Sequence, residues 1–173
     1  NQRIGIIIKM IKAILACDDL GGVSKDGTMP WPKNSKDLRW FKNNTVKNIV
    51  VMGSTTWDDP LMPGPLPKRT NVLATTREKD YPGAQKYISG EITKEIQAIA
   101  KENKNITTWI IGGPNIINQT LDIIDEFYLS RIPGEYNCDT FLPLDKIEKL
   151  FDKTWSEDHG AVEFQIWKKR GVY

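Results

Sequence analysis

The sequence predicts a single α/β domain in which about four helices flank a central, mostly parallel sheet with an antiparallel C-terminal edge. Three observations lead to this prediction. Short apolar runs alternate with stretches of helical spacing along most of the 173-residue chain. Several of the runs end at a glycine or a polar cluster that leads directly into a helical segment. The last strand-like segments are joined without an obvious long helix, which indicates antiparallel pairing there.

The composition of the chain indicates a globular protein. The length suits one domain with a sizeable core rather than two. Hydrophobic residues make up 39% and charged residues 27%, which is typical of a globular chain and not of a disordered or fibrous one. The 24 basic and 22 acidic residues are scattered, and no apolar run approaches the ~18 residues that span a bilayer. We therefore expect neither nucleic acid nor a membrane as partner.

The ends of the chain and the rare residue types give further expectations. Residues 1–9 are expected to be an extension or an artificial remnant, because Met10 would serve as a native start, and residues 10–173 to be the domain. Cys17 and Cys138 are the only cysteines, so a reducing cytoplasm is expected. The single histidine, His159, lies in a turn-like stretch, which leaves no material for a Cys/His metal site or a Ser/His/Asp triad. We expect no metal.

The predicted strands are short apolar runs bounded by glycine, proline or polar residues. They lie at residues 11–16, 49–52, 71–74, 109–111, 127–132 and 162–167. Capping residues and helical spacing predict the helices. The helices begin at Asn34 or Ser35, at Ser54-Thr55-Thr56, at Ile92, and after Gly112-Gly113-Pro114. Residues 18–27 and the proline-rich stretch 60–67 read as loops.

Three predicted strand ends suit phosphate groups. Gly53-Ser54-Thr55-Thr56 and Gly112-Gly113 present backbone N–H groups at helix starts, and Thr76-Arg77 adds hydroxyl and guanidinium donors. The carboxyl ends of parallel strands gather ligands at one edge of a sheet. Each signal alone is weak, because neither glycine turn matches GxGxxG or GxxxxGK[ST]. Together they indicate one ligand with separated phosphates.

Asp37 is a carboxylate in apolar company, between Trp31 and Phe41. Asp37 and Phe41 share a helix face because they are four residues apart. One interpretation makes Asp37 a first-turn acid that favours the helix dipole and faces water. The other places it in a pocket, where it binds the N–H donors of a planar ligand and is desolvated enough to raise its pKa. Sequence position does not decide between them.

Six motifs follow one another along the chain. They are Met29-Pro30-Trp31, Asp37-Leu38 with Trp40-Phe41-Lys42, Val51-Met52-Gly53 with Thr56-Trp57, Pro65-Leu66-Pro67 with Arg69 and Asn71, Ile110-Ile111-Gly112-Gly113, and Asp139-Thr140-Phe141. No single motif is specific, but their order and spacing are. From Met10 to about Lys168 the chain resembles the dihydrofolate reductase family. The resemblance implies a cytoplasmic, monomeric enzyme that uses NADPH to reduce 7,8-dihydrofolate to tetrahydrofolate.

The resemblance also implies roles for individual residues. Asp37 would bind the amino group and ring N–H of the pterin and promote protonation at N5 while hydride arrives at C6. Met29 would lie on a mobile loop, Trp31 at an ordered water, and Ser130 beside the carboxylate. The implied substrate-binding residues are Ile14, Leu38, Phe41, Leu66, Arg69 and Ile111, with Arg69 on the glutamate α-carboxylate. The implied cofactor-binding residues are Ala16, Val23, Gly53, Ser54, Thr55, Thr56, Thr76, Arg77, Gly112, Gly113, Asn115 and Ile117, with Thr76 and Arg77 on the 2′-phosphate.

Three positions depart from the family pattern. Ser54 replaces a frequent basic residue, Ile117 a frequent aromatic, and Ser24 a frequent glycine. These changes bear on cofactor preference and loop motion, not on the reaction class. Two alternatives stay open: a related pyrimidine reductase of riboflavin synthesis, which the Trp31 to Phe41 segment disfavours, and a nucleotide-binding module without catalysis.

Overall fold

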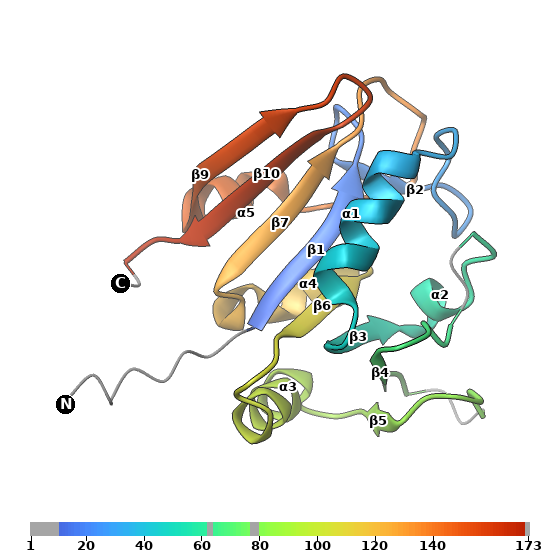
Figure 1. Cartoon of the computed structure of the whole chain (residues 1–173), viewed down its shortest axis with the longest axis vertical. Coiled ribbons are helices and arrows are strands. Elements are labelled where there is room, and N and C mark those ends of the chain that lie inside the picture. The colour runs from blue at the N-terminus through green and yellow to red at the C-terminus, as the bar shows by residue number, and fades with distance from the viewer. Residues whose placement is uncertain (1–10, 62–63, 77–79, 172–173) are drawn as a thin grey trace.

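An eight-stranded sheet organises the chain in a computed structural model, which describes residues 11–61, 64–76 and 80–171 (Figure 1). The strand order is β5-β4-β3-β6-β1-β7-β10-β9. All neighbouring pairs from β5 to β7 are parallel, and the pairs β7–β10 and β10–β9 are antiparallel. The strands are β1 (Ile11–Cys17), β3 (Ile49–Gly53), β4 (Thr70–Ala74), β5 (Lys86–Ile88), β6 (Thr108–Gly112), β7 (Glu126–Arg131), β9 (Phe151–Asp158) and β10 (Glu163–Lys169). The predicted mostly parallel sheet with an antiparallel C-terminal edge is confirmed.

Helices cover both faces of this sheet. Successive strand residues point to opposite sides, and since both sets are apolar in the central strands, each face has to be covered. Val51 packs in a core cluster with residues of α3, α4 and α5, whereas its neighbour Val50 packs in a second cluster with α1 and α2. In Figure 1, α1 crosses in front of the sheet while α4 and α5 lie behind it. The helices are α1 (Ser35–Thr45), α2 (Ser54–Trp57), α3 (Ile92–Glu102), α4 (Pro114–Thr120) and α5 (Leu144–Leu150), with the 3₁₀ turn η2 (Leu121–Ile123) after α4.

The sequence-based prediction missed five helices and strands whose local patterns are weak. α5 is a seven-residue helix with one fully buried side chain, Ile147, and β9 is exposed along nearly its whole length. The short strands β2 (Gly22–Ser24) and β8 (Thr140–Phe141) form a separate two-stranded antiparallel sheet. The three-residue strand β5 was also not predicted. Because α5 was missed, the expected count of about four helices is one short of the five α-helices among the described residues.

Side-chain capping explains where α1 begins. Asn34 is the N-cap residue, and its Oδ1 accepts a hydrogen bond of 3.0 Å from the backbone N–H of Asp37. The expected Ser54-Thr55-Thr56 cap at α2 is wrong, because Gly53 is the N-cap there and makes no side-chain bond. The hydroxyls of that segment are consequently left available for other partners.

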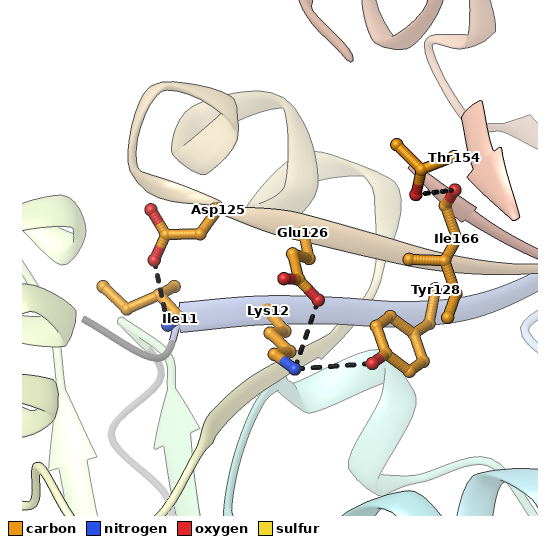
Figure 2. Close-up of polar contacts among 7 residues, drawn as sticks. All are labelled: Ile11, Lys12, Asp125, Glu126, Tyr128, Thr154 and Ile166. Carbon is orange, nitrogen blue, oxygen red and sulfur yellow. Dashed lines mark hydrogen bonds and ion pairs between the residues drawn. The ribbon is translucent and has the colours of Figure 1, made fainter. Parts of the chain in front are cut away.

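Polar contacts fasten the start of β1 to β7 (Figure 2). Lys12 Nζ lies 3.2 Å from Glu126 Oε1 and donates to the Tyr128 hydroxyl at 3.4 Å. The backbone N–H of Ile11 donates to Asp125 Oδ2 at 3.2 Å. These contacts fix the N-terminal ends of the central strands, which leaves their carboxyl ends to form the opposite edge of the sheet.

Candidate active site

A cavity of about 620 Å³ opens at the carboxyl ends of the parallel strands. Its wall comes from β1, β3, β4, β6 and β8, from α1, α2, α4 and the start of α3, and from residues 18–29, which we call the cover loop. This is the size and place expected for a ligand site in a parallel α/β sheet. The predicted site residues on its wall are Ile14, Ala16, Val23, Met29, Asp37, Leu38, Phe41, Gly53, Ser54, Thr55, Thr56, Thr76, Ile111, Gly113 and Asn115.

Asp37 lies on this wall and not in solvent. α1 presents it toward the sheet, and the residue is only 7% exposed. Burial raises the pKa of the Asp37 carboxyl above its ordinary value, and the nearby Ser130 hydroxyl opposes that shift. Between the two interpretations left open by the sequence, the structure supports the pocket.

Ser130 and Trp31 support this end of the cavity from behind and do not line it. Ser130 on β7 pairs with Ala16 on β1 and is 1% exposed. Its Oγ is fully enclosed, and none of the described residues lies in normal hydrogen-bond geometry to it. The hydroxyl is still close enough to Asp37 to lower the pKa of that carboxyl. Trp31 is 6% exposed and packs edge-on against Tyr136. A buried hydroxyl beside a carboxylate is suited to bind that carboxylate or an ordered water.

Arg69 lies over the ring of Phe41, which is one of the apolar wall residues near Asp37. Its guanidinium lies 5.9 Å from the ring centroid of Phe41, and Nη1 donates to Thr45 Oγ1 at 3.0 Å. Desolvation lowers the pKa of Arg69 from its ordinary value. Leu66 is buried in the core and makes backbone bonds to the Asn71 side chain, so neither Leu66 nor Arg69 is on the cavity wall.

The other end of the cavity is made of hydroxyls and glycine backbone. Ser54, Thr55 and Thr56 start α2 on the wall, facing Gly113 before α4. Gly112 has a φ of +122°, which side chains rarely adopt, and its peptide bond to Gly113 is cis. A Cβ on Gly113 would meet only Thr56 Oγ1, at 3.9 Å, so it would project into open space. This open backbone cradle with hydroxyl donors fits the phosphates of a dinucleotide.

Three residues predicted at this end are not found on the described wall. The side chain of Ile117 is fully buried in the core, and its neighbour Ile116 lies on the wall, so a role of Ile117 at the cofactor stays a prediction. A one-residue step rotates a helical side chain by about 100°. Gly112 is not on the wall, and Arg77 lies outside the described residues.

Carboxylates that the sequence reasoning missed hold the cover loop. Buried Asp18 accepts from the backbone N–H groups of Gly22 at 2.8 Å, Leu20 at 3.0 Å and Tyr136 at 3.1 Å. Burial acts to raise the pKa of Asp18, but these hydrogen bonds outweigh it and the pKa is lowered. Asp59, a second carboxylate on the cavity wall, accepts from Thr28 Oγ1 at 2.8 Å. The one local signal was the pair Gly21-Gly22 shortly after Asp18, because an aspartate just before glycines is typical of turns closed by its side chain.

Comparison with known proteins now places the chain. The sequence profile described as dihydrofolate reductase matches residues 10–167. The chain belongs to the dihydrofolate reductase family. A dihydrofolate reductase of Buchnera aphidicola subsp. Baizongia pistaciae (strain Bp) is 31% identical over 176 residues, covering 97% of this chain and 99% of that protein.

Two further proteins are similar to the chain: one matches it over part of a longer sequence, and the other shares its fold. A protein of Oryza sativa subsp. japonica, named as a bifunctional dihydrofolate reductase-thymidylate synthase, is 39% identical over 137 residues. That match covers 70% of this chain but only 28% of the rice protein. The solved structure of dihydrofolate reductase from Enterococcus faecalis, complexed with NADP(H) and RAB-propyl, has a TM-score of 0.78 at 24% identity. It covers 94% of this chain and 97% of the other, and this likeness shows the fold.

Membership in the dihydrofolate reductase family fixes the reaction class. The chain is an oxidoreductase of dihydrofolate that uses NADPH, which decides against both the pyrimidine reductase and the module without catalysis. Among the residues that the structure describes, none of the helices combines the length and apolarity needed to cross a bilayer.

Proposed function

We propose that Asp37 is the group on which the reduction of dihydrofolate depends in this chain. The observation that carries the proposal is its burial on the cavity wall, where desolvation raises the pKa of the carboxyl. A carboxyl with a raised pKa holds or shares a proton nearer to neutral pH than a surface acid does. Asp37 would bind the amino group and ring N–H of the pterin and promote protonation at N5.

The neighbours of Asp37 would orient the substrate and exclude water. Leu38, Phe41, Ile14 and Ile111 give an apolar cleft for the pterin and benzoyl rings. Ser130 and Trp31 would enclose the carboxylate and one ordered water. Arg69 is already held by hydrogen bonds, so its guanidinium fork needs little reordering to bind the glutamate carboxylate.

The hydroxyl and glycine end of the cavity would hold NADPH. When bound, the cofactor supplies the hydride that reaches C6 of the pterin. Ser54, Thr55, Thr56 and Gly113 would donate to its phosphates, with Gly53 and Asn115 beside them on the wall. Thr76, together with Arg77, would bind the 2′-phosphate, and Ala16, Val23 and Met29 would enclose the nicotinamide and exclude water from it.

We further propose that residues 10–173 act as one monomeric domain in the cytoplasm, without nucleic acid as a partner. Cys17 and Cys138 are both free thiols, and burial raises their pKa to about 12 and about 11. Thiols that stay protonated suit a reducing compartment and resist oxidation there.

The test is direct. Purified protein is mixed with NADPH and dihydrofolate, and the loss of nicotinamide absorbance is followed against samples that lack either compound. We expect loss only when both are present. No consumption above these backgrounds would contradict the proposal.

A further inference from the structure

The N-terminus of α1 touches the turn between β9 and β10 through two polar side chains. Asn34 Nδ2 donates to the carbonyl oxygen of Ala161 at 2.9 Å, and Lys36 Nζ donates to that of His159 at 2.9 Å. These partners are more than a hundred residues away in sequence. They join the helix that carries Asp37 to the antiparallel edge of the sheet.

Both ends of the Asn34 amide are in use. Oδ1 accepts from the backbone N–H of Asp37 at 3.0 Å, while Nδ2 reaches Ala161. The Asn34 carbonyl also accepts the first helical bond, from the Leu38 N–H at 3.0 Å. A single side chain therefore connects the backbone of Asp37 to the hairpin.

The hairpin offers a fixed surface for this contact. Its turn is closed by bonds from the His159 N–H to Val162 at 2.9 Å and from the Ala161 N–H to His159 at 3.0 Å. Val162 is fully buried, so the carbonyl of Ala161 is held next to a packed residue. Two turns along α1, Trp40 stacks on Phe164 of β10 with centroids 4.3 Å apart, which adds an apolar contact between the same two elements.

We propose that Asn34 is a positioning residue, which sets the place of the Asp37 carboxylate by tying the first turn of α1 to the β9–β10 turn. The inference rests on the proposed role of Asp37. Capping alone does not require asparagine, because serine, threonine and aspartate cap helices about as well. Only asparagine has both a capping oxygen and an amide that reaches the Ala161 carbonyl.

The effect of Asn34 on Asp37 does not act through charge. The charged or titratable side chains at the junction are Lys36 on α1 and Glu157, Asp158 and His159 on the hairpin, and all four are exposed. From β7, only the Ser130 hydroxyl acts on Asp37 alongside burial. Replacing Asn34 with serine changes none of these groups, so any effect on Asp37 comes through position and burial.

The test compares Asn34→Ser with the wild type by two readouts. Carboxyl-carbon NMR gives the titration of Asp37 without substrate, and kcat and KM are measured across pH with NADPH and dihydrofolate. We expect the titration of Asp37 to move toward that of an ordinary aspartate, because the loosened helix turn lets water reach it. We expect kcat at neutral pH to fall about tenfold, since small misplacements of a reacting group are costly. The loss should shrink at acidic pH, and KM for NADPH should hold.

Two further variants keep the proposal falsifiable. Asn103→Ser is the matched control, because Asn103 donates to Ile99 at 2.8 Å at the far end of α3 and is not on the wall of the active-site cavity. It should lower stability without moving the Asp37 titration. If Asn34→Ser does not fold, Lys36→Met removes the other hairpin contact and should shift the titration in the same direction, by less.

The outcomes separate this proposal from that of the function. The positioning role would be overturned if Asn34→Ser showed the wild-type titration of Asp37 and the wild-type pH dependence of kcat. If Asn34→Ser is unfolded, a wild-type titration of Asp37 in Lys36→Met would overturn it. An inactive wild-type protein would instead refute the proposed function, while the NMR titration would still decide whether Asn34 places Asp37.

Discussion

The two ends of the cavity are built in opposite ways. At the substrate end, one buried carboxylate, Asp37, lies among apolar side chains such as Leu38 and Phe41. At the cofactor end, the polar groups assigned to NADPH among the described wall residues are neutral: the hydroxyls of Ser54, Thr55 and Thr56, the amide of Asn115 and glycine backbone. A function that depends on one ionisable group is lost when that group is changed. A function shared among many neutral donors is weakened in small steps. The difference predicts unequal costs for single substitutions.

The largest effect is expected for Asp37→Asn. The variant keeps the size of the side chain but removes the proton-transfer group, so turnover should fall by at least ~100-fold. NADPH affinity should stay close to wild type, because the cofactor binds the other end. Steady-state kinetics and cofactor titration measure the two quantities. Asp59→Asn is the matched control for loss of a wall carboxylate, and its turnover should fall far less. Near-full activity of Asp37→Asn at neutral pH would show that the substrate end does not depend on one ionisable group, and the contrast with the cofactor end would be lost.

A smaller effect is expected for Gly113→Ala at the cofactor end. The new methyl group meets only Thr56 Oγ1 at 3.9 Å in the protein, so the fold should be unaffected, but it enters the space assigned to the phosphates. Overfilling a packed site costs ~1–3 kcal/mol, or about 5- to 150-fold in Kd for NADPH. Cofactor titration by fluorescence measures this. Wild-type NADPH affinity in a folded variant would place the phosphates elsewhere.

A modest effect is expected where the cover loop meets the wall. Thr28→Val removes the 2.8 Å bond to Asp59 while keeping the shape of the side chain. One such bond is worth ~1 kcal/mol, so kcat/KM should fall by about fivefold. Thr28→Ser keeps the hydroxyl and should retain wild-type kinetics. If the valine and serine variants behave alike, the bond does not hold the loop in the working enzyme.

The smallest effect is a pH-dependent change in stability. Burial raises the folded-state pKa of Asp37 above its ordinary 3.8, so the folded protein binds the proton more tightly than the unfolded chain. Stability therefore falls as pH rises from about 3.8 through the folded-state pKa. Asp37→Asn removes this cost, and its unfolding midpoint without ligands should exceed that of the wild type at neutral pH. The gain should vanish in acid. A gain independent of pH would contradict the assigned burial cost.

Local sequence patterns predicted most of the fold. The apolar runs of β1, β3, β4 and β6 and the cap at Asn34 depend on neighbours within a few residues, so sequence reasoning found them. The pairing of β2 with β8 joins segments about 116 residues apart, as the Ser24–Thr140 contact does, and short polar strands carry no pattern that predicts such a partner.

The site was predictable in part, for the same reason. Sequence spacing put Asp37 and Phe41 on one helix face, but only packing against β1 and β7 decided that this face meets the cavity. Asp59 was missed because its partner Thr28 comes from the cover loop, 31 residues earlier. The sequence did not show that Ile116, and not Ile117, meets the described cavity wall, because helix phase must be known to within one residue and the glycine turn before α4 sets that phase.

The stacking of Trp40 gives the protein an optical signature. Its ring is nearly parallel to that of Trp155 on β9, at an interplanar angle of 4° and a centroid distance of 5.9 Å. Two indoles at this distance couple their electronic transitions, and the coupling changes when either ring moves or tilts. Near-ultraviolet circular dichroism should therefore report whether α1 sits on the antiparallel edge, in solution, without any label or substrate.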